Sequence, residues 1–331
     1  MTAARGKQRW RSFRESRFLP ATVIAGIIAC AAALFVGSYT YATANPKPRH
    51  IPVAVVGDVP AAQAQRLESE LNAAMDSSLE VRHTGDRARA LDLLAEQTVF
   101  AVIETAPDQT MTLGLSSASG QTVATVLQNA VPPVAQRAGY TVTTTDLHPL
   151  QPGDPHGLTL FYMTIASVVV GFVGAIQLGV HARGLRPGER IAFIAAYAVL
   201  GGFAILVTVD RLLGALDLPL LSWPVLTLTM FTSGMVFTMF SALFGRWAML
   251  PTWGIMILLG NPTSGGSVSW PLLPGLLAAV GRWLPPAASV DAQHTAVYFP
   301  DHQHLGPWLV LSGWSAAGIA VFLIAQRRAD S

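Results

Sequence analysis

The stretch Leu258-Leu-Gly-Asn-Pro-Thr-Ser-Gly-Gly266 separates two apolar runs and decides how many times the chain can cross a bilayer. The run before it, Trp247–Leu259, would rise about 20 Å as a helix at about 1.5 Å per residue. The hydrocarbon core of a bilayer is about 30 Å thick, so this run is short for a crossing. The sequence becomes apolar again at Trp270–Val280, which leaves the polar stretch between two short hydrophobic segments.

The composition as a whole predicts a membrane protein. The chain has 331 residues, of which 51% are hydrophobic and 12% are charged, whereas a soluble globular chain is about 25% charged. Elsewhere in the chain, five apolar runs approach or exceed the length of about 20 residues that a spanning helix needs. These runs are Phe18–Ala42, Leu158–Val180, Ile191–Val209, Trp223–Phe244 and Pro307–Ala325.

Lysine and arginine residues near the ends of the apolar runs predict the orientation, because cytoplasmic loops are enriched in them. One side of the predicted bilayer collects most of these residues: Arg5, Lys7, Arg9, Arg11, Arg14, Arg17, Arg183, Arg186, Arg190, Arg246, Arg327 and Arg328. The other side has only Arg211 and Arg282 in its short loops. Both termini are therefore expected in the cytoplasm, so the number of crossings is even and Trp247–Leu259 counts as a short span, the fifth of six in chain order.

The predicted fold is an α-helical polytopic membrane protein of six spans with an inserted extracytoplasmic α/β domain. The expected boundaries are a basic cytoplasmic segment at 1–18, a first transmembrane helix at 19–42, the α/β domain at 43–157, a five-span domain at 158–326 and a cytoplasmic tail at 327–331. Gly260-Asn-Pro262 ends the short span, and 263–269 forms a turn near the outer membrane face. Trp270–Leu284 then forms a helix that lies at the interface or re-enters the bilayer, as irregular backbone at that depth needs protein or water around it.

Residues 51–146 alternate between strand-like and helix-like patterns. The predicted strands are Val53–Val56, Leu79–Arg82, Val99–Glu104, a half-exposed Met111–Leu115 and Tyr140–Thr145. The predicted helices start after Pro60, near Asp86 and at Ser119, and the last reaches Arg137 with a disturbance at Pro132-Pro133. This order favours a mixed sheet with helices packed on it.

The sequence offers no catalytic constellation, so we expect no enzyme and no cofactor or metal site. The acids Asp58, Glu104, Asp108 and Asp146 are scattered, and Gly6-Lys7 lacks the pattern of a phosphate-binding loop. His294, Asp301, His302 and His304 fall in a predicted outer loop without a fixed scaffold for a metal. The basic residues follow membrane orientation, so nucleic acid is not an expected partner. The single Cys30 is read as an apolar residue of the first span, with a lipidation box as the alternative.

Three groups in the membrane part allow two interpretations each. Thr227, Gly234, Thr238 and Ser241 share one face of the fourth long run, where they serve either helix packing or a polar path. Arg183, Arg186 and Arg190 either set orientation only or dock a cytoplasmic partner. Asp210-Arg211 is either a solvated span end or a gating pair, and adjacent helical residues are not expected to face each other.

The layout resembles the type-two class of ATP-binding-cassette (ABC) exporter permeases, in particular their phage-infection-protein-like branch. The order of one span, a large outside domain and five more spans carries the resemblance. So do Val99-Phe-Ala-Val-Ile-Glu-Thr-Ala-Pro107, Leu113-Gly-Leu-Ser-Ser-Ala-Ser-Gly120 and Gly260-Asn-Pro-Thr-Ser-Gly-Gly266, the last followed by Leu273-Pro274, Leu284-Pro285-Pro286 and Tyr298-Phe299.

The resemblance implies a permease subunit that dimerises in the lipid bilayer and exports an amphipathic or cell-envelope substrate, with a separate ATPase chain. It also implies short helices near the outer leaflet after the fifth span, around the motif residues Gly260, Asn261, Pro262, Gly265 and Gly266. The alternative is a membrane-anchored receptor or envelope-maintenance protein whose outside domain binds a partner. Many alanines and glycines with only two lysines favour a bacterial plasma (inner) membrane.

Overall fold

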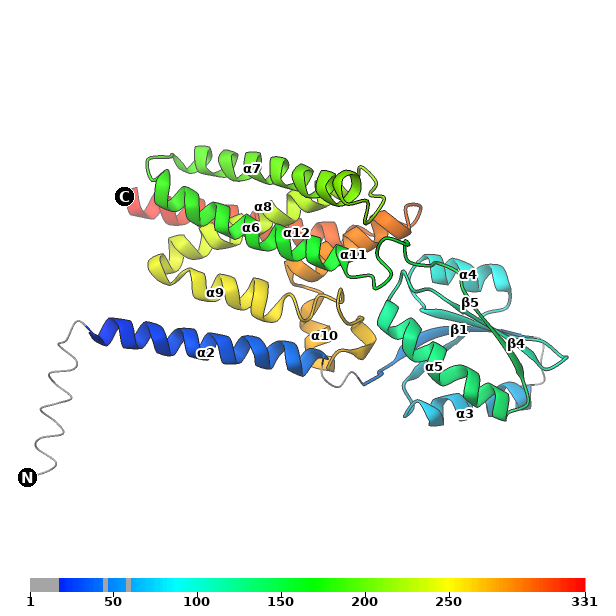
Figure 1. Cartoon of the computed structure of the whole chain (residues 1–331). Coiled ribbons are helices and arrows are strands. Elements are labelled where there is room, and N and C mark those ends of the chain that lie inside the picture. The colour runs from blue at the N-terminus through cyan, green and yellow to red at the C-terminus, as the bar shows by residue number, and fades with distance from the viewer. Residues whose placement is uncertain (1–17, 44–46, 58–60, 331) are drawn as a thin grey trace, which may run out of the picture.

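The computed structural model of the chain describes residues 18–43, 47–57 and 61–330. A bundle of long helices occupies one end of the molecule, and a small α/β unit occupies the other (Figure 1). The basic N-terminal segment predicted at 1–18 lies outside the described residues except for Phe18.

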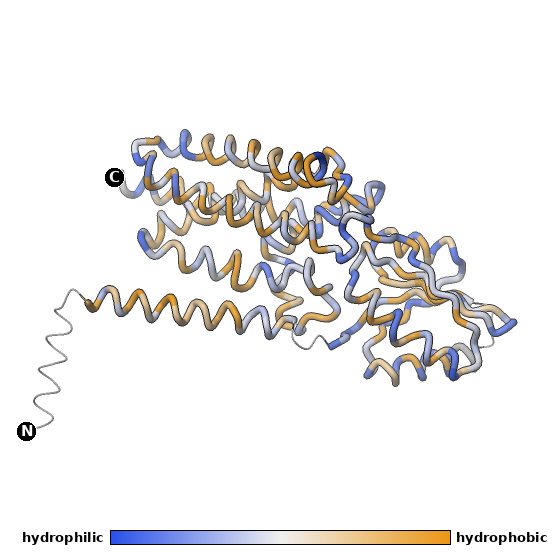
Figure 2. The backbone as a smooth tube through the Cα atoms, viewed as in Figure 1, coloured by the Kyte–Doolittle hydropathy of each residue, from blue (hydrophilic) through white to orange (hydrophobic). Residues whose placement is uncertain are grey.

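Five helices are long and apolar enough to cross a membrane, as judged from length and composition. They are α2 (Phe18–Thr43), α6 (Thr159–His181), α7 (Pro187–Val207), α8 (Ser222–Phe244) and α12 (Leu305–Asp330). Each covers one of the five long apolar runs of the sequence, and Figure 2, coloured by residue hydropathy, shows that hydrophobic residues predominate along them. The chain therefore has the helices of a multi-pass membrane protein.

Helix α8 lies at the centre of the bundle, where α6, α7 and α12 all contact it. Glycines on its neighbours allow this close approach: at Gly171 of α6, a Cβ atom would overlap the Met230 carbonyl oxygen of α8. At Gly202 of α7, a Cβ atom would lie 2.9 Å from the Thr227 backbone nitrogen. Small residues at such crossings bring helix backbones together, which is how helices pack when lipid gives no hydrophobic driving force.

The short apolar run forms a continuous but irregular helical segment. It consists of η2 (Gly245–Trp247), α9 (Met249–Trp253) and the π-helical η3 (Gly254–Leu259). It runs beside α2 (Figure 1), and the rings of Phe35 and Trp253 lie 6.3 Å apart between centroids. Its helix over Met249–Leu259 is shorter than the five candidate spans.

The region after Gly260 differs from the single helix predicted at 270–284. Two short helices replace it, η4 (Trp270–Leu272) and α10 (Gly275–Gly281), because Pro271 opens the first and Pro274 precedes the second. A further helix, α11 (Pro285–Tyr298), occupies a region for which no helix was predicted. Its two leading prolines fit a first turn, where the missing N–H groups have no helical partner in any case.

The α/β unit contains a five-stranded mixed sheet in the order β2-β1-β3-β4-β5. The strands are β1 (Ile51–Gly57), β2 (Leu79–His83), β3 (Ala101–Thr105), β4 (Thr110–Leu115) and β5 (Thr141–Asp146). The β1–β2, β1–β3 and β4–β5 pairs are parallel, and β3–β4 is antiparallel. The helices are α3 (Ala61–Ala74), α4 (Arg87–Ala95) and α5 (Gln121–Arg137).

Helix α5 contains Pro132 and Pro133, where a disturbance was predicted; these prolines lack the N–H groups of two helical hydrogen bonds, and the buried Val131 and Val134 hold the helix against the core. One local prediction for this unit is wrong. Strand β4 was expected to be half-exposed, yet only Thr110 of its residues is exposed. The strand lies between β3 and β5, and Leu147 covers the position of Gly114.

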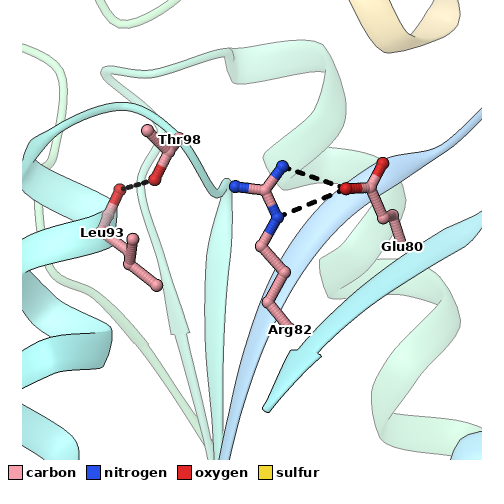
Figure 3. A network of polar contacts seen from close by, with 4 residues as sticks. All are labelled: Glu80, Arg82, Leu93 and Thr98. Carbon is pink, nitrogen blue, oxygen red and sulfur yellow. Dashed lines mark hydrogen bonds and ion pairs between the residues drawn. The ribbon is translucent and has the colours of Figure 1, made fainter. Parts of the chain in front are cut away.

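Short-range polar contacts stabilise the ends of α4 and pair two residues of β2. The Asp86 carboxylate accepts a hydrogen bond from the Arg89 backbone N–H at 2.6 Å and caps α4, as predicted. At the other end of α4, the Thr98 hydroxyl donates to the Leu93 carbonyl at 2.9 Å (Figure 3). Figure 3 also shows Arg82 and Glu80 paired on β2 at 3.0 Å; both side chains are exposed enough that the pair adds little stability.

Candidate functional site

The polar stretch Gly260–Gly266 forms a tightly packed turn at the end of η3. At Gly260, a Cβ atom would lie 2.5 Å from Pro286 and 2.8 Å from the Ile255 carbonyl oxygen. The Thr263 hydroxyl donates to the Leu259 carbonyl at 2.7 Å, and the Ser264 hydroxyl donates to the Asn261 carbonyl at 2.7 Å. The same two carbonyls also accept from the Thr263 and Ser264 backbone N–H groups, at 3.3 Å and 3.1 Å, so backbone and side chain of each residue hold the turn together.

Each residue of the predicted motif has a defined place in this turn. Asn261 and Pro262 are buried, and the Asn261 side chain lies against the Tyr39 hydroxyl of α2. Among the described residues, the Asn261 amide oxygen has no hydrogen-bond partner. Gly265 has a φ of +81°, which favours glycine, and a Cβ atom at Gly266 would lie 2.9 Å from the Phe161 ring of α6.

The chain after this turn docks onto the α/β unit. The Ser269 backbone N–H donates to the Thr122 hydroxyl of α5 at 2.9 Å, and the two hydroxyls lie 2.8 Å apart. The Arg49 backbone N–H donates to the Pro271 carbonyl at 2.9 Å. Three apolar residues of this segment share one hydrophobic core with the sheet: Val268, Leu272 and Leu273. The segment therefore completes the α/β unit.

Helix α11 connects the bundle to the α/β unit through polar contacts on both sides. Toward the bundle, the Ser289 hydroxyl accepts from Thr229 of α8 at 2.7 Å and lies 3.2 Å from the Thr164 hydroxyl of α6. Toward the α/β unit, the Gln97 amide donates to the Thr295 hydroxyl at 3.1 Å. The His294 Nδ1 lies 3.1 Å from the Ala118 carbonyl oxygen, which fixes the proton of neutral His294 on that nitrogen.

A cavity of about 1370 Å³ lies between these parts of the molecule. Its lining comes from the turn at 263–267, α10, α11, the first turns of α12 and the loops of the α/β unit. The α/β side contributes mainly polar groups, namely Gln97, Ser117, Ser119 and Thr122. The helical side contributes large apolar groups, including Trp283, Leu305, Leu309 and Trp314. The helical side also contributes charged and polar groups, so the lining as a whole combines large apolar side chains with polar ones.

Asp291 of α11 places a carboxylate in this cavity. The side chain is open to the cavity but surrounded by protein, and this burial raises its pKa, while nearby His304 lowers it. Its carboxylate makes no hydrogen bond or ion pair with any described residue. His294 also lines the cavity, and burial lowers its pKa, while its contact with the Ala118 carbonyl and the charge of Asp154 act in the opposite direction.

The predicted polar face of α8 is used for packing. A Cβ atom at Gly234 would lie 2.5 Å from the Tyr197 hydroxyl of α7, and the Thr238 hydroxyl donates to the Gly234 carbonyl at 2.8 Å. Thr227 packs against Gly202 of α7. Neither these residues nor the half-buried Ser241 line the cavity. Of the two interpretations, this geometry favours helix packing over a polar path.

The three arginines of the α6–α7 connection lie at the end of the bundle away from the α/β unit (Figure 1). Arg183 and Arg186 are exposed, and Arg190 is half-buried. The Glu189 carboxylate accepts from the Arg186 backbone N–H at 2.8 Å and closes the start of α7. Two exposed cations on this short connection remain available to a partner.

Two other expectations about charged groups are corrected. Asp210 and Arg211 do face each other, at 3.0 Å, because they lie in the π-helical turn η1 (Thr208–Leu212), which departs from α-helical spacing. His294 lies in α11 and outside any loop, so it is separated from the loop residues Asp301, His302 and His304. No group of three or more metal-ligating side chains occurs within the described residues.

Sequence reasoning missed Asp291 and the cavity. A single acid between apolar and small residues has no pattern of its own, and its importance depends on the helix that contains it. The signal that could have found the helix is Leu284-Pro285-Pro286, because proline is favoured in the first turn.

Comparisons with protein-family models, with curated proteins and with solved structures find no match for this chain. The resemblance to exporter permeases therefore stays an expectation from the sequence.

Proposed function

We propose that this chain is the membrane permease subunit of an ABC-type exporter that moves an amphipathic or cell-envelope substrate. The cavity between the bundle and the α/β unit is the proposed substrate site. A separate ATPase chain supplies the energy, because this sequence contains no phosphate-binding loop. The observation that carries the proposal is the amphipathic lining of the cavity at one end of a bundle of apolar helices.

The distribution of charge supports an extracytoplasmic α/β unit. Arginines of the short connections and of the C-terminal end gather at the end of the bundle away from the α/β unit: Arg183, Arg186, Arg190, Arg246, Arg327 and Arg328 (Figure 1). Under the positive-inside rule this end is cytoplasmic, as are both termini. The segment Gly245–Leu259 then adds a short crossing, the fifth of six in chain order, that ends at Gly260. A bacterial plasma membrane is the proposed location.

The walls of the cavity support an amphipathic substrate. Leu309 is 69% exposed and Trp283 is 63% exposed, and both line the cavity. Large apolar side chains with this exposure are stable where lipid or an apolar ligand covers them. The hydroxyl and amide groups of the opposite wall would bind the polar part of the same molecule.

Partners are proposed on two surfaces. Within α2, no residue of the most apolar window is buried, so a second copy of the chain or lipid covers this helix. We assign the homodimer contact to it. The exposed Arg183 and Arg186 form the docking point for the ATPase subunit.

The alternative of a membrane-anchored receptor requires an α/β unit that works when held by α2 alone. A fragment ending at residue 157 would lack Val268, Leu272 and Leu273, which belong to the core of that unit. The shared core therefore favours a function that uses the α/β unit and the bundle together.

The first test is purification of the full chain from its native membrane in a mild detergent. The expected result is a stoichiometric nucleotide-binding subunit with vanadate-sensitive ATP hydrolysis. A homo-oligomer without ATPase activity, under conditions that preserve known transporter complexes, would contradict the ABC assignment.

The second test fills the cavity. Gly313 lines it, and a Cβ atom there meets no atom within 4 Å, so Gly313→Trp should occupy the cavity without disturbing α12. Gly179→Trp on α6 is the matched control, because its Cβ position is also open and it does not line the cavity. Export is expected to fail in the first variant and persist in the second. Export by both folded variants would exclude the cavity as the substrate site.

A further inference from the structure

The Asp291 carboxylate is an unpaired anion in the cavity. Its side chain is exposed to the cavity, with protein around it at longer range, and it has no hydrogen-bond or ion-pair partner among the described residues. An ionised group in such surroundings is costly unless another charge or hydrogen-bond donor compensates it. A carboxylate left in this state in a membrane-protein cavity indicates a ligand that supplies the missing partner.

The other ionisable groups of the cavity are mostly engaged by neighbouring groups of the chain; exposure alone does not set them apart, because Asp291 is exposed as well. Glu96 is paired with Arg89 of α4 at 3.3 Å, and His294 is bound to the Ala118 carbonyl. Arg282 is exposed and lies over the Trp283 ring at 5.6 Å, and His156 is exposed. His304, in the loop directly before α12, lies close enough to act on the pKa of Asp291. Asp291 is therefore the acid of the cavity that has no hydrogen-bond or ion-pair partner among the described residues.

The wall contributed by α12 and α10 is apolar. Leu305 and Leu309 lie one helical turn apart on α12, and both are largely exposed to the cavity region. Trp270, Trp283 and Trp314 add aromatic faces, and aromatic faces attract organic cations as well as alkyl chains. A small hydrophilic cation would leave this wall uncovered.

We propose that the cavity binds a cationic amphiphile, with its positively charged head group against the Asp291 carboxylate and its alkyl chain along the first turns of α12. The inference rests on the proposed function, because it names the substrate class of the same cavity. A titratable proton on the ligand is not required, so a quaternary ammonium head group serves as well as a primary amine.

The test measures binding of radiolabelled dodecyltrimethylammonium to the immobilised full-length chain in a non-ionic detergent. Asp291→Asn is expected to raise the Kd by about tenfold or more, since a charged pair in an enclosed site is lost. Glu96→Gln is the matched control, because it removes a second cavity acid that is already paired, and its Kd should stay within about twofold. An unchanged Kd in a folded Asp291→Asn protein would overturn the proposal.

Competition separates the contributions of charge and chain. Laurate carries a similar alkyl chain with an anionic head group, and tetramethylammonium carries the head group alone. Both are expected to compete at least about tenfold more weakly than unlabelled dodecyltrimethylammonium. Laurate that competes equally well would show recognition of the chain only or of Arg282, and would refute the assignment to Asp291.

A measurement on the unmodified chain keeps the proposal testable if Asp291→Asn fails to fold. Acidification neutralises Asp291 and Glu96 and adds positive charge at His156, His294 and His304, while Arg282 stays charged. All of these changes disfavour a bound cation, so binding of the quaternary ammonium must weaken as pH falls. Binding that is independent of pH, or stronger in acid, would refute it.

The proposal and the proposed function can fail separately. Binding that depends on Asp291, together with export that survives Gly313→Trp, would support the binding site and contradict its role in transport. Export that is blocked by Gly313→Trp, together with no preference for cationic amphiphiles, would support the cavity as the substrate site and contradict the proposed substrate class.

Discussion

Helices α8 and α2 have the same length of 26 residues as candidate spans but opposite surroundings. The most apolar 18-residue stretch of α2 is more apolar than that of α8, yet none of it is buried, whereas 61% of the α8 stretch is buried. In a soluble protein the more apolar helix would be the more buried one. Here the less apolar helix is central, because its small and hydroxyl residues allow close packing and hydrogen bonds between helices.

The largest expected effect comes from overfilling the contact of α8 with α6. Gly171→Val would push a side chain into the Met230 carbonyl and the Ser233 side chain, so we expect a loss of about 1–3 kcal/mol of stability. Gly179→Val in the same helix, where no atom lies within 4 Å of a Cβ position, should leave stability nearly unchanged, because valine is a slightly better helix former than glycine. Thermal unfolding in detergent measures the stability of both variants. Equal losses of stability would contradict the idea that close packing against α8 sets Gly171 apart from Gly179.

A pH-dependent effect is expected at α11, which is deeply packed like α8 but carries a histidine. Burial lowers the pKa of His294, so the unfolded chain binds this proton at a higher pH than the folded chain. Stability should therefore fall as pH drops below the unfolded value of about 6.5, by no more than about 1.4 kcal/mol per pH unit for one proton. His294→Gln can keep the hydrogen bond to the Ala118 carbonyl and should flatten this slope in thermal unfolding. A slope that is unchanged in the variant would assign the effect to other groups, among them His148, whose pKa burial also lowers.

A smaller effect is expected from a single interhelical hydroxyl. Thr229→Val removes the donor to Ser289 and should cost about 0.5–1.5 kcal/mol. Thr22→Val on α2 is the matched control, because its hydroxyl donates only to the Phe18 carbonyl of its own helix. Chemical unfolding of the two variants should separate them, and a cost as large at Thr22 would contradict the assigned role of the interhelical bond.

The smallest effect is expected on α2 itself. Gly37→Leu adds a side chain where no atom lies within 4 Å, so the stability of the single chain should change by no more than about 0.5 kcal/mol. Thermal unfolding of detergent-isolated monomer gives the test. A large loss would mean that α2 packs more closely on the bundle than its exposure indicates.

The five long helices could be predicted from sequence because length and hydropathy are local properties of a run. The strands and helices of the α/β unit followed from local periodicity for the same reason, and Asp86 was recognisable as a cap. The docking of Val268, Leu272 and Leu273 onto the sheet could not be predicted, since it joins segments more than a hundred residues apart. Asp291 escaped notice because its surroundings come from α11, α12 and the α/β unit together.

The shared core also sets an order of events during synthesis. The last residue of the sheet is Asp146, whereas Leu273, which closes the same core, leaves the ribosome only after more than a hundred further residues. At about 5–20 residues per second this delay lasts on the order of ten seconds. For that time the emerging sheet has an uncovered apolar surface on Phe100 and α5, and it is a target for a holding chaperone or a protease. The maturation of the α/β unit is therefore tied to insertion of nearly the whole chain.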